Sequence, residues 1–194
     1  MKRIFFIAFI LISVQSFGQD LLKFNTQRNE LSKKGMLTLG SWAGVNLVGS
    51  TTGLLLSETE YAKGFHQMNI LFNVVNMGLA IPSYISAAKD DPSVYGPGES
   101  YRLQLKKEKI FVINTALDLV YITGGVRMLQ RSKWDTEHGE KFRGLGTSLV
   151  IQGSFLFAFD FAMTLLHSKN RRKNFDPQIN IGASRNGIGM RWVF

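Results

Sequence analysis

The sequence predicts an all-α membrane protein, a four-helix transmembrane bundle with a short C-terminal β-hairpin. Three observations support this prediction. The apolar residues, 45% of 194, are gathered into five blocks with charged connectors between them. Four of these blocks are long enough, or nearly so, to cross a hydrocarbon core of roughly 30 Å as helices. None of the four shows the polar stripe, with a period of about 3.6 residues, that is typical of a surface helix in a soluble protein.

The first apolar block has the three-part organisation of a secretory signal peptide, predicted at 1–18. A basic start precedes an apolar run at 4–14. Ser16 and Gly18 then place small residues at the −3 and −1 positions of a cleavage site before Gln19. An uncleaved N-terminal anchor is the alternative, although the run is short for a membrane span.

The other four blocks are predicted to be the membrane spans of a bundle that covers residues 36–168. An interfacial segment is expected before the bundle at 19–35, and a basic tail with the hairpin follows at 169–194. The shortest span requires Lys109 and Arg127 to extend from its ends toward the membrane surface. The predicted spans are residues 36–56, 64–88, 110–126 and 144–166.

The bundle has two possible internal organisations. Residues 31–53 align without a gap to residues 103–125, and the two segments share six identical residues. The bundle is therefore either four independent helices or two repeated helical hairpins related by an axis along the membrane normal.

Alternating apolar residues predict two strands near the C-terminus, at 178–184 and 187–194. The tripeptide Arg185-Asn186-Gly187 between them is typical of a hairpin turn. Two strands are too few for an outer-membrane barrel, which needs at least about eight. We therefore expect an amphipathic hairpin that lies on the bundle or on the bilayer surface.

Polar residues inside the predicted spans form the candidate site. At a rise of about 1.5 Å per residue, four of them lie about 12–18 Å from the same end of the bundle, near the membrane midplane. Because an ionised Asp in lipid is costly, the two acids are expected to face inward and to share one proton. The two amides can donate hydrogen bonds to them. The predicted layer is Asn46, Asn76, Asp118 and Asp160, with His66, Asn69, Asn73, Asn114, Tyr121 and Gln152 as supporting polar residues.

Most other chemistries lack a signal in the sequence. The absence of cysteine excludes disulfides, thiolate nucleophiles and cysteine metal sites. There is no nucleotide-binding loop and no nucleophile elbow, and His66 and His138 do not have the spacing of a known metal motif. We therefore expect no catalytic residue, no metal and no cofactor.

The net charge of +9 indicates an anionic partner. The spans exclude nucleic acid, and they favour the lipid bilayer itself, with anionic headgroups bound by the basic run after the last span. A homo-oligomer is a further partner that the sequence leaves open. The basic run consists of Lys169, Arg171, Arg172 and Lys173.

Two rules disagree about the orientation in the membrane. A signal peptide sends the mature N-terminus, and after four spans also the C-terminus, to the periplasmic side of a bacterial inner membrane. The connectors on that face contain 15 Lys and Arg after Gln19, against six on the other face. The positive-inside rule would place the richer face in the cytoplasm. We favour the signal peptide, because it acts first during insertion.

Several motifs resemble the signature of an uncharacterised family of small bacterial four-span membrane proteins. The resemblance covers about residues 31–167, and Phe72 stands where the family pattern has Trp before the second Asn. It implies the fold class and the membrane, and it implies no activity. The motifs are Phe65-His66-Gln67-Met68-Asn69, Asn73-Val74-Val75-Asn76, Leu117-Asp118 with Tyr121, and Gln152 to Asp160.

Three functions remain open at this point. The first is a non-enzymatic binding or scaffolding bundle whose polar layer is structural. The second is a small proton- or ion-coupled carrier that uses Asp118 and Asp160. The third is a membrane-embedded enzyme that acts on a lipid or another apolar substrate, with the same two residues as acid and base. We favour the first, because layers rich in Asn often hold helices together.

Overall fold

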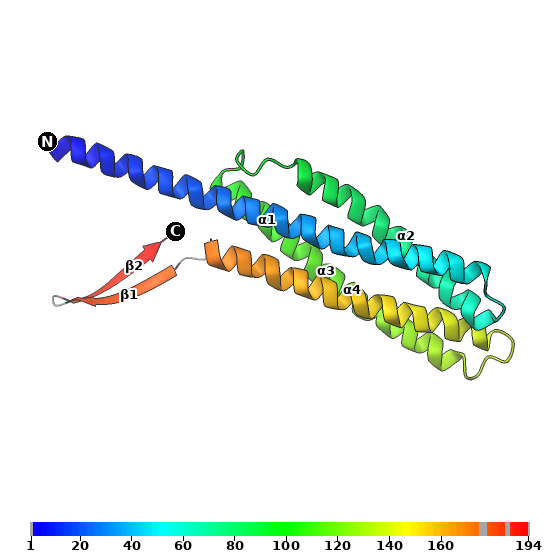
Figure 1. Ribbon diagram of the computed structural model, residues 1–194. Helices are drawn as coiled ribbons and strands as arrows, with labels where there is room; N and C mark the ends of the chain where they lie inside the picture. The colour runs from blue at the N-terminus through cyan, green and yellow to red at the C-terminus, as the bar shows by residue number, and fades with distance from the viewer. Residues whose placement is uncertain (1, 175–177, 185–186, 194) are drawn as a thin grey trace.

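The structure, a computed structural model, describes residues 2–174, 178–184 and 187–193, with side chains from Leu21 to Asn174. Four long helices, each antiparallel to the next, form a bundle that is followed by two strands (Figure 1). The predicted all-α bundle of four helices is confirmed. The helices are α1 (Lys2–Leu55), α2 (Glu60–Lys89), α3 (Pro97–Arg131) and α4 (Gly139–Asn174), and the strands are β1 (Gln178–Ser184) and β2 (Gly187–Val193).

Three helices of the described chain, α2, α3 and α4, are long and apolar enough to cross a membrane. They contain three of the four spans that the sequence predicts. The remaining predicted span, residues 36–56 of α1, is not among them. Its composition explains the difference, because nine of the 14 residues from Gly40 to Gly53 are Gly, Ser, Thr or Asn.

Large apolar side chains of the bundle point outward, while its buried side chains are mostly polar. Among the described residues, 17 buried side chains are polar or charged and nine are apolar. Val45, Val48 and Val120 are 75%, 71% and 64% exposed. Water would not favour such an extensive apolar surface, whereas a bilayer covers it. This distribution is consistent with a membrane protein.

Glycines allow α4 to approach both α2 and α3 closely. A Cβ atom on Gly64 of α2 would lie 2.6 Å from the carbonyl oxygen of Lys141. A Cβ atom on Gly146 of α4 would lie 2.8 Å from the carbonyl oxygen of Gly125. Both distances are too short for a real side chain, so these contacts require glycine. Small residues at such crossings are a common way for helices to associate in lipid.

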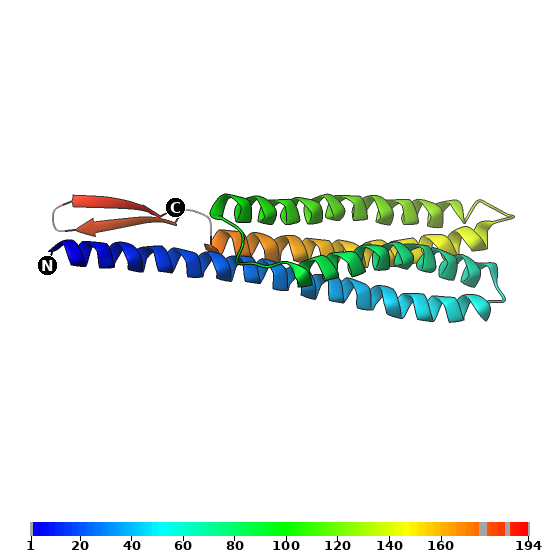
Figure 2. The same cartoon turned by 90° about the horizontal axis from the view of Figure 1, so that it is seen from above.

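The helices are not packed evenly around the bundle axis. α1 packs mainly on α2, and α4 packs on both α2 and α3. α2 and α3 run on either side of α4 (Figure 2). Across the described length of these two helices, no Cα atom of one lies within 8 Å of a Cα atom of the other. The face between α2 and α3 is therefore the open side of the bundle.

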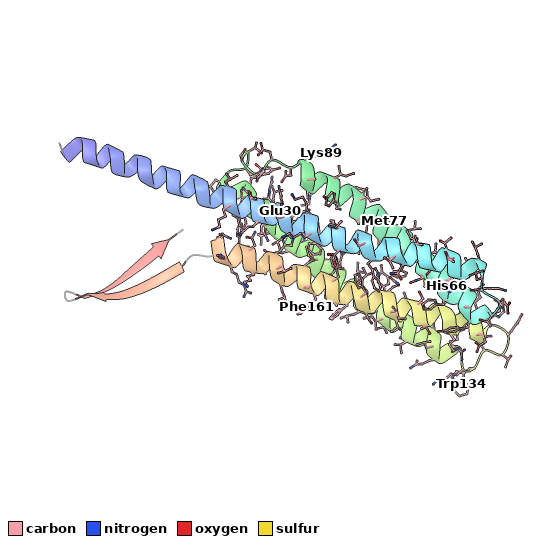
Figure 3. All side chains as sticks on the ribbon, viewed as in Figure 1. Glu30, His66, Met77, Lys89, Trp134 and Phe161 are labelled. Atoms are coloured by element: carbon pink, nitrogen blue, oxygen red, sulfur yellow. The ribbon has the colours of Figure 1, made fainter. Side chains whose placement is uncertain are left out.

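The segment 19–35, predicted as a separate interfacial segment, continues α1 without a break. The reason is that no Pro lies in it and its one Gly, Gly35, is the last residue. Phe24 and Asn25 on its inner face have no exposed surface. This part of α1 packs at the end of the bundle that also holds Glu30 and Lys89, opposite the end with Trp134 (Figure 3).

The two strands form an antiparallel pair in which Gln178 lies opposite Val193 and Ser184 lies opposite Gly187. Their side chains, and residues 185–186 between them, lie outside the described part of the chain. Docking of the hairpin on the bundle or on the bilayer therefore stays a prediction. The same holds for the cleavage of a signal peptide at 1–18.

Candidate functional site

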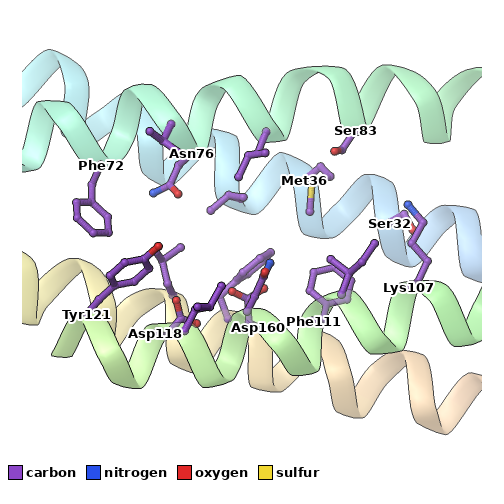
Figure 4. Close-up of a pocket in the computed structure, with 18 of the residues that line it drawn as sticks. Ser32, Met36, Phe72, Asn76, Ser83, Lys107, Phe111, Asp118, Tyr121 and Asp160 are labelled. Atoms are coloured by element: carbon purple, nitrogen blue, oxygen red, sulfur yellow. The ribbon is translucent and has the colours of Figure 1, made fainter. Parts of the chain in front are cut away.

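A crevice of about 490 Å³ runs along the open side of the bundle, between α2 and α3. α1 and α4 form its back (Figure 4). Its size is within the range of about 300–1,000 Å³ that is typical of small-molecule sites. Most of the lining is apolar and includes Leu39, Val75, Leu79, Ile110 and Leu156.

Both ends of the crevice are defined by side chains. At one end, Phe72 of α2 and Tyr121 of α3 meet edge to face, with ring centroids 5.1 Å apart and an interplanar angle of 88°. At the other end, Lys107 of α3 faces Ser32 of α1 and Ser83 of α2 (Figure 4). The crevice is therefore an elongated compartment that is open sideways between the two helices.

Two acids, Asp118 of α3 and Asp160 of α4, meet in the wall of this crevice. They are 2% and 4% exposed, and their carboxyl groups are hydrogen-bonding neighbours. Asn114 lies beside Asp160. Two carboxylates have no proton to place between them, so this contact requires one of the two to be protonated. Asp118 Oδ2 has no hydrogen-bond partner among the described residues.

The predicted polar layer is divided between two places. Asn76 lines the crevice with the two acids. Asn46 instead accepts hydrogen bonds from Asn69 Nδ2 at 3.0 Å and from Gln152 Nε2 at 3.2 Å. Gln152 lies eight residues from Asp160 along α4, which is about 12 Å. The expectation that Asn46 reaches the acids is therefore wrong.

A stagger between helices explains this error. In the sequence, the charged connectors at this end of the bundle stop near Gly35 and begin again at Ser168, so the depth of Asn46 counts from Gly35 and that of Asp160 from Ser168. The structure places Gly35 against Met163, where a Cβ atom would be 2.5 Å from the Met163 Cε atom. Met163 is five residues nearer the middle of the bundle than Ser168, so the two counts began at different heights.

The amides away from the crevice form a network that ties α1, α2 and α4 together. Trp42 Nε1 donates to Gln152 Oε1 at 2.8 Å, and Gln152 Nε2 donates to Asn69 Oδ1 as well as to Asn46. Asn69 Nδ2 also donates to Ser50 Oγ at 2.6 Å. The Trp42 ring stacks on Phe155 with centroids 3.9 Å apart. The network fixes the height at which the three helices meet.

Two further predicted residues lie on α2 outside the crevice. Asn73 Nδ2 donates to the backbone oxygen of Asn69 at 2.7 Å, and Asn73 Oδ1 accepts from Asn76 Nδ2 at 3.5 Å. Asn73 thus connects the amide network to the crevice. His66 lies near the turn between α1 and α2, where a Cβ atom on Gly53 would overlap its ring. His66 forms no hydrogen bond to the acid pair or to the amide network within the described residues.

Comparison with known proteins places the sequence in a family. Residues 38–161 match the model of a family of unknown function, DUF6992, over more than half of the chain. The chain belongs to this family. The expectation of an uncharacterised family is therefore confirmed. No curated protein and no solved structure matches the chain.

The DUF6992 range contains the acid pair and most of the crevice. A polar cluster that the sequence analysis missed lies partly outside it, because Gln104 and Glu108 fall within the range and His167 and Arg171 follow its end. In this cluster Gln104 Nε2 donates to the backbone oxygen of His167 at 2.7 Å, and Arg171 Nε donates to Glu108 Oε1 at 3.1 Å. Gln104 and His167 have no exposed surface. The sequence signal for this cluster is the four-residue spacing of Ser100, Gln104 and Glu108, which places them on one face of a helix. These residues lie in the connector between the predicted spans 64–88 and 110–126.

A charged group also fixes the connection between α2 and α3. Arg28 of α1 forms a salt bridge of 3.3 Å with Asp90, and the Tyr95 hydroxyl donates to the same carboxylate. Burial alone would raise the pKa of Asp90. Hydrogen bonds from Tyr95 and Asn29, together with the Arg28 guanidinium, lower that pKa below its ordinary value instead. Asp90 is therefore ionised at neutral pH and holds the connection against α1.

Proposed function

We propose that this DUF6992 protein is a non-enzymatic integral membrane protein that binds a small amphiphilic molecule in the crevice between α2 and α3. One observation supports this most directly. Asp118 is 2% exposed and lines an otherwise largely apolar crevice, and its Oδ2 atom has no partner among the described residues. An unpaired buried acceptor costs about 1–3 kcal/mol, which a bound hydrogen-bond donor would recover.

The position of the crevice suits a ligand that arrives from the bilayer. Its open side lies between two of the helices that are apolar enough to cross a membrane. The outer surfaces of both helices are apolar, with Val74 56% and Val112 51% exposed. A lipophilic molecule could therefore move sideways from lipid into the crevice without crossing water.

The acid pair selects the polar group of the ligand. With one proton shared between Asp118 and Asp160, the pair has one negative charge and can accept further hydrogen bonds. A hydroxyl or an amine of the ligand is therefore favoured over a carbonyl, which only accepts. The amide network behind the crevice keeps its own hydrogen bonds and fits the structural role that we favour for the other polar residues.

We further propose that residues 36–56 of α1 cross the membrane as a fourth span, in a bacterial inner membrane, with both mature termini in the periplasm. Support comes from the packing of α1 along α2 and from its outward apolar residues, such as Leu37, Val45 and Leu55. The basic run at the C-terminal end of α4 would then lie near lipid headgroups.

Two neighbouring valines provide the test of ligand binding. Val74 and Val75 have similar exposure, 56% and 55%, but only Val75 lines the crevice. Hexadecanol is a suitable probe, because it offers a hydroxyl donor on an apolar chain. Its affinity for the purified protein in nonionic detergent should fall at least about tenfold in Val75→Phe, because the larger ring fills the crevice.

The Val74→Phe variant is the matched control and should bind hexadecanol as the parent does. Equal affinity of the parent and both variants would contradict the proposal, because the alcohol would then bind elsewhere on the apolar surface. Failure of the parent to bind hexadecanol would contradict it as well.

A proton-coupled carrier is the second candidate, and the contact between Asp118 and Asp160 favours it. If a cationic ligand displaces the shared proton, its binding releases protons into solution. An unbuffered titration of the purified protein with hexadecylamine measures this release. Proton release in the parent that is lost in the Asp118→Asn, Asp160→Asn double variant would support the carrier. Absence of release from the parent would contradict the carrier and favour a protein that only binds its ligand.

A further inference from the structure

We propose that the Lys107 end of the crevice binds an anionic group, so that the ligand has an anion at one end and a hydrogen-bond donor at the other. This inference rests on the proposed binding function and specifies its ligand. The shared chemistry is a carboxylate or a phosphate on a single hydrocarbon chain.

Lys107 is a cation without a counter-ion of its own. It lines the crevice, is half-buried, and forms no ion pair or hydrogen bond among the described residues. Asp90, the acid whose charge acts on Lys107, already forms a salt bridge with Arg28. An anion in the crevice would provide the charge that the protein itself does not.

Two hydroxyl groups lie at the same end of the crevice. Ser32 of α1 is 4% exposed, and its Oγ atom has no hydrogen-bond partner among the described residues. Ser83 of α2 also lines the crevice, and Figure 4 shows Ser32 beside Lys107 and Ser83 on the opposite wall. Donors from three helices thus line the same end of the crevice. A carboxylate or a phosphate accepts several such hydrogen bonds at once.

The distance between the two polar ends matches a lipid chain. Lys107 and Asp118 are 11 residues apart on α3, which is about 16 Å along the helix axis. This is close to half of a hydrocarbon core of about 30 Å, the depth of one leaflet. The lining between them is apolar and includes Met36, Ile110 and Phe111. A single chain can therefore lie along α3 with its anion near the membrane surface.

Three probes of equal chain length test the two polar ends of the crevice one at a time. Hexadecanoate has the anion alone, hexadecanol has the donor alone, and 16-hydroxyhexadecanoate has both. The parent protein should bind 16-hydroxyhexadecanoate most tightly. Hexadecyl phosphate, titrated in parallel with hexadecanoate, distinguishes a phosphate headgroup from a carboxylate.

Lys106 and Lys107 are a matched pair for this experiment, because Lys106 is exposed and does not line the crevice. Lys107→Met should weaken the binding of both acids roughly ten- to a hundredfold and leave the affinity for hexadecanol within about twofold. Lys106→Met should change none of the three affinities. Lys107→Arg should retain the affinity for the acids, because it retains the charge.

Ser32→Ala is an independent variant that removes a hydroxyl with no partner in the protein. It should weaken the binding of both acids several-fold without lowering the thermal stability. If Lys107→Met and Ser32→Ala leave the affinity for the acids unchanged, or weaken all three probes alike, the inference fails. The proposed function still stands in that case if hexadecanol binding remains sensitive to Val75→Phe.

Discussion

Buried polar residues of this bundle differ in whether their hydrogen bonds are satisfied within the protein. The side chain of Gln152 contacts Trp42, Asn46 and Asn69 through hydrogen bonds, and its oxygen and nitrogen both have partners. Asp118 is equally buried, but its Oδ2 atom has none among the described residues. A residue that serves only to hold helices together has no reason to leave an acceptor unpaired. This difference is our basis for separating structural from ligand-binding residues.

The two kinds of residue should respond differently to substitution. Asp118→Asn keeps the shape of the side chain and loses no partner at Oδ2, so the free energy of unfolding should change by less than about 1 kcal/mol. Gln152→Leu removes three hydrogen bonds, to Trp42, Asn46 and Asn69, and should lower that free energy by at least about 2 kcal/mol. Denaturant unfolding in mixed micelles measures both. A larger loss for Asp118→Asn than for Gln152→Leu would show that the acid pair is the structural element.

At the scale of the element, close packing of α3 on α4 depends on glycine. A Cβ atom on Gly146 would lie 2.8 Å from the Gly125 carbonyl oxygen, whereas a Cβ atom on Gly78 of α2 would meet nothing within 4 Å. Gly146→Ala should therefore lower the thermal unfolding temperature in detergent, because the helices must move apart. Gly78→Ala, the same change in an open position, should leave it unchanged or raise it slightly. Equal effects of the two substitutions would contradict this account of the packing.

The elements also show what a sequence can and cannot predict. Apolar blocks without a polar stripe are sufficient to predict the helices, and three of the polar residues named from the sequence, Asn114, Asp118 and Tyr121, line the crevice from α3. The relative height of the helices was not predictable, because it depends on contacts such as Gly35 with Met163. The crevice was not predictable either, since it results from the separation of α2 and α3.

The whole molecule has a surface that a bilayer would cover and two ends that water would reach. Three helices are apolar enough to cross a membrane, and α1 lies along them with exposed apolar residues of its own. With α1 as a fourth span, Leu21 and Asn174 are on one side of the membrane. The signal-like start at 1–18 and the distribution of Lys and Arg disagree about which side that is.

Reporter fusions decide the orientation. Alkaline phosphatase fused after Asn174 should be active, because a signal peptide and four spans place this end in the periplasm. The same reporter after Trp134, in the connection between α3 and α4, is the control and should be inactive. Activity at Trp134 with none at Asn174 would reverse the orientation in favour of the positive-inside rule. Activity at both positions would contradict the placement of α4 as a span.

Photolabelling tests the central claim, that the crevice between α2 and α3 is a binding site for an amphiphile, most directly. The probe is hexadecanol with a diazirine near its hydroxyl group, applied to the protein in bilayers and located by peptide mass spectrometry. Our account predicts labels concentrated on crevice residues near the acid pair, such as Asn76, Leu117 and Tyr121, and their loss in Val75→Phe but not in Val74→Phe. Labels spread evenly over outward residues such as Val74 and Val120, unchanged in Val75→Phe, would contradict it.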